Sequence, residues 1–333
     1  MNHPRSAAEP VAAVAAPEAA GVLEEAVETR GASGRRGAAL VPIALVVGGV
    51  LSVQFGSAVA ALLMPKAGPL GVVTLRLAVA ALVLMAVCRP RLRGHSRADW
   101  GTVVAFGVAM GGMNNLFYEA LHRIPLGIAV TLEVLGPLAL SVIASRRLAS
   151  LLWAVLALAG VALLGGGGFD RLDPAGAAFA LGAGVMWALY IVFSARTGRR
   201  FPQADGLALA MVVAAALSLP LGVLESGSKL LVPTTLGLGA AVALLSSVLP
   251  YTLELMALRR LPASTFAVMM SLEPAIAAMA GFFILDQALS TTDALAIALV
   301  IGASVGAVRG TRPARPGGRA RRREVRKART PAE

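Results

Sequence analysis

The amino-acid sequence predicts an all-α polytopic membrane protein whose ten transmembrane helices form two inverted five-helix repeats. Three observations support this prediction. Of the 333 residues, 57% are hydrophobic and only 14% are charged, with a mean hydropathy of +0.76, which is too apolar for a soluble fold. The apolar residues are gathered into runs long enough to cross a bilayer. One stretch of nineteen residues also occurs twice, once in each half of the chain.

The two ends of the chain lack such runs. Residues 1–38 are rich in Ala, Glu and Pro, so we expect a disordered cytoplasmic leader. The first apolar run, near residues 40–64, is too long for a signal peptide and should remain as a transmembrane helix. Residues 309–333 form an Arg-rich tail, expected to be disordered and attracted to anionic lipid rather than to nucleic acid.

The length of the apolar runs sets the number of spans. About 20 apolar residues cross the ~30 Å hydrocarbon layer at 1.5 Å per residue. On this basis the sequence predicts ten spans, near residues 40–64, 69–88, 100–121, 125–145, 149–167, 175–195, 205–224, 234–257, 262–284 and 289–308. With the N-terminus inside, the cytoplasmic loops contain eleven Arg residues and the opposite loops contain four basic residues. This bias follows the positive-inside rule and predicts that both ends are cytoplasmic.

The repeated stretch predicts how the halves are related. Residues 120–138 and 257–275 read ALHRIPLGIAVTLEVLGPL and ALRRLPASTFAVMMSLEPA. At a shift of 137 positions six of the nineteen residues coincide, against about two expected by chance in a chain rich in Ala and Leu. Because each half has an odd number of helices, the second half should be inverted relative to the first, as in many secondary transporters. The expected halves are residues 39–168 and 169–308.

Each repeat contains a glutamate in the middle of an apolar span, Glu133 in the fourth and Glu273 in the ninth. A charge at that depth costs roughly 2.5–3.5 kcal/mol on insertion scales, so each glutamate is a functional candidate. Pro137 removes the hydrogen bond to the Glu133 carbonyl, and Pro274 removes the one to the Met270 carbonyl, so both helices should kink. We expect both carboxylates to face one cavity, where low dielectric favours protonation and at least one exchanges a proton as substrate leaves. The alternative is a structural glutamate, protonated or hydrogen-bonded between helices.

Other polar residues within the spans are candidates for the same cavity. Arg76 in the second span could bind a substrate carboxylate in a bidentate manner, or pair with an acidic residue on another helix. Polar residues follow helical spacing in the third span and in the eighth, which should kink at Pro250. The candidate substrate- and proton-binding residues are Glu133, Glu273, Arg76, Asn114, Asn115, Tyr118, Tyr251 and Gln54, with Trp187 and Tyr190 as aromatic wall.

The segments LGIAVTLEVLGPLAL at 126–140 and YTLELMALRRLPASTFAVMMSLEPAIAAMAGFFILDQAL at 251–289 resemble the threonine/homoserine exporters. That family belongs to the EamA branch of the drug/metabolite transporter superfamily, and the resemblance extends over nearly all of residues 40–308. It implies ten helices in two inverted halves, the bacterial inner membrane, and proton-driven export of small amino acids. The superfamily also exports drugs and other small metabolites, which is the alternative function. Only 5% of the residues are aromatic and Arg76 would repel cations, which favours zwitterions.

Other classes of protein fit the sequence less well. An intramembrane enzyme would need a nucleophile with a base, or a metal, but no predicted span contains histidine. The three histidines and one cysteine offer no metal-ligand cluster. A receptor or scaffold would leave the paired glutamates unexplained. We therefore expect no enzymatic activity, metal or cofactor, and the expected partners are a small amino acid, protons and membrane lipid, with a homodimer left open and no nucleic acid.

Overall fold

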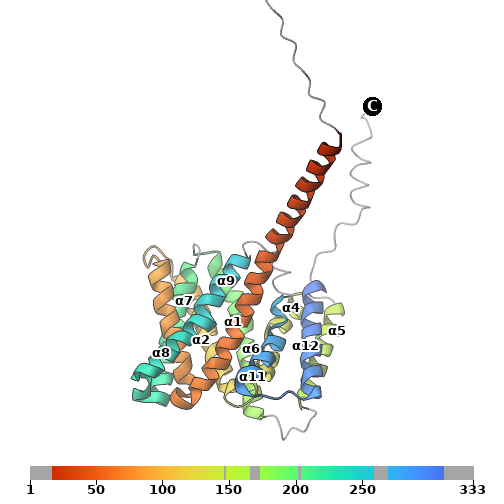
Figure 1. Cartoon of the computed structure of the whole chain (residues 1–333). Helices are drawn as coiled ribbons and strands as arrows, with labels where there is room; N and C mark the ends of the chain where they lie inside the picture. The colour runs from red at the N-terminus through yellow and green to blue at the C-terminus, as the bar shows by residue number, and fades with distance from the viewer. Residues whose placement is uncertain (1–16, 146–147, 166–172, 202–203, 259–268, 311–333) are drawn as a thin grey trace, which may run out of the picture. The chain divides into compact units, whose positions relative to one another are not determined.

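The computed structural model describes residues 17–145, 148–165, 173–201, 204–258 and 269–310. All regular structure in these segments is helical (Figure 1), which confirms the all-α prediction for them. The chain forms two compact units, Met1–Ala44 and Leu45–Glu333. In the first unit, helix α1 (Pro17–Cys88) begins within the predicted leader. Ala and Glu are strong helix formers and Pro is well suited to a first helical position, which favours helix from Pro17 onward.

Helix α1 bends at Gly68, where φ is 64° and ψ is 164°, a backbone conformation that favours glycine. The apolar part of the helix, Val41–Cys88, has 48 residues. At 1.5 Å per residue it would extend for roughly 72 Å, more than twice the thickness of a hydrocarbon layer. The bend therefore divides it into a first arm, residues 45–67, and a second arm, residues 69–88.

The start of the second arm is capped from a distant helix. The Glu225 carboxylate accepts hydrogen bonds from the backbone N–H groups of Leu70 and Gly71 at 2.8 and 3.0 Å. A carboxylate is favourable at this position because the first N–H groups of a helix have no intrahelical partner. The contact ties the bend of α1 to the end of α7 (Asp205–Ser226).

The remaining helices continue the chain to its C-terminal part. They are α2 (Arg97–Leu121), α3 (Leu126–Glu133), α4 (Leu135–Ser145), α5 (Leu148–Gly165), α6 (Pro174–Gly198), α7, the 3₁₀ helix η2 (Gly227–Leu231), α8 (Pro233–Ala243), the π-helix η3 (Leu244–Val248), α9 (Leu249–Leu258), α11 (Glu273–Leu285) and α12 (Thr291–Gly310). Within the described residues, four stretches can cross a membrane by length and composition: Val41–Cys88, Leu126–Ile143, Pro174–Gly198 and Asp205–Leu231. Shorter apolar helices cover Leu152–Leu163, Pro233–Val248, Glu273–Leu285 and Thr291–Ala307. The count of ten spans stays a prediction.

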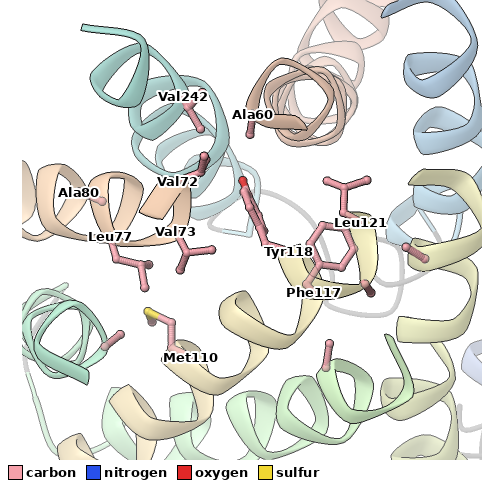
Figure 2. Packing of buried hydrophobic residues seen from close by; sticks show 14 of the residues in the cluster. Ala60, Val72, Val73, Leu77, Ala80, Met110, Phe117, Tyr118, Leu121 and Val242 are labelled. Atoms are coloured by element: carbon pink, nitrogen blue, oxygen red, sulfur yellow. The ribbon is translucent and has the colours of Figure 1, made fainter. Parts of the chain in front are cut away.

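Helix α2 lies at the centre of the second unit and packs against α6 and α7. Figure 2 shows Tyr118 of this helix beside Val72 and Val73 of the second arm, with Phe117 and Leu121 of α2 on its other side. Elsewhere α3 packs against α11, and α5 packs against α12. This packing surrounds a small polar region with buried apolar side chains.

Candidate substrate cavity

A cavity of about 130 Å³ lies between the two arms of α1, α2, α3, α6, η3 and the start of α11. One water molecule needs only ~10–15 Å³, so the cavity has room for a small solute. Five of the predicted site residues line it: Gln54, Arg76, Asn114, Glu133 and Glu273, together with the predicted aromatic residues Trp187 and Tyr190. The cavity wall thus contains one guanidinium and two carboxyl groups.

Arg76 of the second arm is held in the wall by three hydrogen bonds. Its Nε donates to Ser247 Oγ at 2.9 Å, its Nη1 to Tyr118 Oη at 3.0 Å and its Nη2 to the Ser246 carbonyl at 2.7 Å. The guanidinium also lies over the Tyr118 ring, 5.5 Å from its centroid. The residue is only 6% exposed, and arginine does not lose its proton in proteins. The arrangement therefore places a fixed positive charge at the cavity.

The Ser246 carbonyl is available to Arg76 for a reason that can be read from the sequence. Pro250 has no N–H to offer the carbonyl four residues earlier, which belongs to Ser246. At this point the helix widens into the π-helix η3, a distortion that is frequent at functional sites. Ser52 Oγ of the first arm donates to the neighbouring carbonyl, that of Leu245. Side chains of both arms of α1 thus satisfy backbone groups of the distorted helix.

Glu133 is the last residue of α3, and the helix resumes as α4 after Val134. The residue is 9% exposed and lines the cavity. Its backbone carbonyl, which Pro137 cannot bond, lies against α6: a Cβ added to Gly184 would be 2.5 Å from that oxygen. A Cβ added to Gly136 would be 1.8 Å from the Gly184 carbonyl. Two glycines therefore let the backbones of α4 and α6 touch and fix the position of Glu133.

Glu273 is the first residue of α11 and lies directly after a turn. It is 6% exposed and also lines the cavity, as does Met270. A carboxylate in the first turn of a helix interacts favourably with the helix dipole. Pro274 follows in that first turn, where its missing N–H costs nothing. The structure therefore brings both predicted glutamates to one cavity at interruptions of their helices, and their role in transport stays a prediction.

Two amide side chains line the cavity and differ in their hydrogen bonding. Asn114 Nδ2 donates to the Met110 carbonyl of its own helix at 2.9 Å. Gln54 of the first arm is 3% exposed, and its Oε1 has no hydrogen-bond partner within the described part of the chain. A buried polar oxygen without a partner is uncommon in native proteins.

Two other predicted site residues, Asn115 and Tyr118, do not line the cavity. Asn115 points toward α7, where its Nδ2 donates to Ser218 Oγ at 2.7 Å, so it joins two helices instead of lining the cavity. Tyr118 is fully buried behind Arg76 and positions the guanidinium. Tyr251 belongs to α9, but its side chain is outside what the structure describes.

The sequence reasoning missed Ser246 and Ser247, which contact Arg76, and Ser57, which also lines the cavity. The position of Pro250 four residues after Ser246 was a usable signal for a free carbonyl. Serines in an apolar helix carry no such signal, because their hydroxyls can also bond within the helix.

Comparison with known proteins gives the family. Residues 174–309 match the EamA-like transporter family. The chain is 41% identical over 268 residues to the threonine/homoserine exporter RhtA of Escherichia coli (strain K12), covering 80% of this chain and 90% of the relative. It is 29% identical over 252 residues to the uncharacterized transporter YwfM of Bacillus subtilis (strain 168), covering 73% and 85%. These relatives and the apolar helices define a multi-pass membrane transporter.

The chain belongs to the EamA-like transporter family, in the group of the threonine/homoserine exporters, as the sequence motifs predicted. A solved crystal structure of a protein with 22% identity covers 84% of this chain and 100% of its own, with a TM-score of 0.52. At that identity the likeness concerns the fold alone.

Proposed function

We propose that this protein is a secondary active transporter that exports small amino acids, threonine and homoserine first, in exchange for protons. The observation that carries the proposal is the cavity in which Arg76, Glu133 and Glu273 share one wall. An amino acid is a zwitterion, and it needs a cation for its carboxylate and an anion for its ammonium. The named substrates of the RhtA relatives are such zwitterions.

Arg76 binds the substrate carboxylate in this proposal. Three of its N–H groups are used by Tyr118, Ser246 and Ser247, so two of the five donors of a guanidinium remain for a ligand. The three protein contacts orient the planar group before substrate arrives, and a charge-assisted bond to a carboxylate is stronger than a neutral one. Arg76 also disfavours cationic drugs, because two like charges in a dry cavity repel strongly.

The glutamates bind the ammonium and exchange it for a proton. A carboxyl group in a cavity of low dielectric is disfavoured as an anion unless a cation or a proton is present. The ammonium of the substrate and a proton are therefore competing partners for the same group. Such competition couples the release of substrate on one side of the membrane to the uptake of a proton.

Pairs of helix contacts support two inverted halves. On the ten-span count, α3 against α11 and α5 against α12 join the fourth and fifth spans of one half to their own equivalents. Helix α2 against α7 joins the third span to the seventh, and α8 reaches the second arm of α1, where a Cβ on Gly239 would be 2.8 Å from Leu75. The third span corresponds to the eighth in the other half, and the seventh corresponds to the second. The contact of α2 with α7 and the contact of α8 with the second arm are therefore equivalent, as a two-fold repeat requires.

The helix interruptions follow the same repeat. Helix α4 begins at Leu135 and α11 begins at Glu273. The two starts are 138 positions apart, which is one more than the 137-residue shift between the repeats. Broken helices near the membrane midplane are typical of the substrate sites of secondary transporters. The inner membrane, with both ends of the chain cytoplasmic, is the location that fits the loop charges.

Overexpression in a bacterial host sensitive to amino-acid excess tests the function. We expect lower intracellular and higher released threonine and homoserine than in cells with the empty vector. The aromatic dye ethidium, measured in the same cells, should be retained. Extrusion of the dye with unchanged amino acids would contradict the proposal and indicate a drug exporter of the same superfamily.

A further inference from the structure

Gln54 lines the cavity, and the proposed function gives its side chain no partner. Its side chain is almost completely buried, it lines the cavity, and its Oε1 has no hydrogen-bond partner in the segments that the structure describes. Buried polar groups are nearly always paired, so an unpaired one that faces a cavity is a candidate for contact with a ligand.

The charged groups of the wall are already matched to the two charged groups of an amino acid. Arg76 fits the carboxylate, and Glu133 and Glu273 fit the ammonium. Asn114 has committed an amide N–H to the Met110 carbonyl. The Gln54 amide, whose Oε1 has no partner in the described residues, therefore remains for the side chain of the substrate.

We propose that Gln54 recognises the side-chain hydroxyl of the substrate and so selects hydroxylated amino acids over their apolar isosteres. An amide offers an acceptor and two donors, and a hydroxyl offers a donor and acceptors, so the two groups match in either direction. Ser57 lies three residues further along the first arm and also lines the cavity, on the same face of the helix. This inference rests on the proposed function, because it assumes that an amino acid occupies the cavity.

The preference for a hydroxylated substrate arises mainly because an apolar analogue leaves the Gln54 amide without a hydrogen-bond partner. Valine has the shape of threonine with a methyl in place of the hydroxyl, and norvaline is related to homoserine in the same way. Either analogue would fill the cavity and bury the Gln54 amide without a partner. A site built to bond a hydroxyl disfavours such analogues because its buried polar group is then left unpaired.

Purified protein in proteoliposomes gives the test. Counterflow of labelled threonine is measured against unlabelled threonine or valine, and counterflow of homoserine against norvaline. For the wild type we expect threonine to compete about tenfold better than valine, the effect of one buried polar group left unpaired. In Gln54→Leu, which keeps the volume but removes the amide, the preference should fall to roughly twofold or less.

The control is Thr197→Val, an isosteric change at another buried oxygen without a partner in the described residues, outside the cavity lining. Its preference should equal that of the wild type. Wild-type protein that binds valine as well as threonine would overturn the inference even if Gln54→Leu does not fold. An unchanged preference in Gln54→Leu would also overturn it while amino-acid export stands. No counterflow of any amino acid by the wild type would overturn the proposed function and the inference together.

Discussion

The guanidinium of Arg76 donates from Nη2 to the carbonyl of Ser246 at 2.7 Å. That carbonyl lies four residues before Pro250, which has no N–H to give it. Pro250, on the eighth predicted span, thus leaves the Ser246 carbonyl free to accept a hydrogen bond from Arg76 on the second predicted span. The bond joins the two predicted halves of the chain at the wall of the cavity.

This relationship predicts that Arg76→Lys damages transport although it keeps the positive charge. A lysine ammonium cannot reproduce the planar fork that meets Tyr118, Ser246 and Ser247 together. We expect the KM for threonine to rise at least about tenfold, the effect of losing one charge-assisted hydrogen bond. Threonine export from preloaded proteoliposomes measures it, with Arg123→Lys as the control, because Arg123 pairs with Glu119 outside the cavity lining. An unchanged KM in Arg76→Lys would show that the fork does not bind substrate.

The contact between α4 and α6 predicts that Gly184→Ala destabilises the protein. The new Cβ would lie 2.5 Å from the carbonyl oxygen of Glu133, and a backbone atom cannot rotate away. Overpacking of this kind costs about 1–3 kcal/mol, more than the ~0.5–1 kcal/mol that alanine usually gains over glycine in a helix. Thermal unfolding in detergent should show a lower Tm.

Gly101→Ala in α2 is the matched control for this change. A Cβ there would meet nothing within 4 Å, so its Tm should equal or exceed that of the wild type. If Gly184→Ala raised the Tm as Gly101→Ala does, the backbone contact that holds Glu133 would be refuted.

The sequence was sufficient to place both glutamates at one cavity, because carboxylates in apolar spans must avoid lipid and the repeat puts them on equivalent helices. It could not separate Asn114 from Asn115. Neighbouring residues on a helix point about 100° apart, and only the arrangement of α6, α7 and α1 decides which amide meets the cavity. The sequence offered both, and the structure brings only Asn114 to the wall.

The partners of Arg76 were also beyond the sequence. An intramembrane arginine must be satisfied, but an acidic residue was as good a candidate as any. The structure uses a tyrosine hydroxyl, a serine hydroxyl and a carbonyl instead. Because these acceptors are neutral, they do not cancel the positive charge of Arg76. The sequence of one helix does not reveal these partners, because they come from other helices.

A pH-dependent effect is expected at the start of α2, outside the spans. Hydrogen bonds from Ser96, and then the nearby Arg200 guanidinium, lower the pKa of the Asp99 carboxyl from its usual value. A lowered folded-state pKa stabilises the fold above the unfolded value of about 3.9 and loses that contribution as pH falls through the folded value. We therefore expect Asp99→Asn to lower the Tm at pH 7 and to lower it less at about pH 3. Equal Tm values at both pH values would mean that the Ser96 and Arg200 contacts contribute no stability.

Proton-driven uptake of labelled threonine into everted membrane vesicles tests the central claim most directly. An acidic lumen should drive uptake in the wild type and in Glu119→Gln, whose carboxylate pairs with Arg123 away from the cavity lining. In Glu133→Gln, in Glu273→Gln or in both, we expect the proton gradient to lose its effect, because an amide cannot exchange a proton for an ammonium. Wild-type, gradient-dependent uptake in both variants would contradict the account and leave the family and the fold without this coupling mechanism.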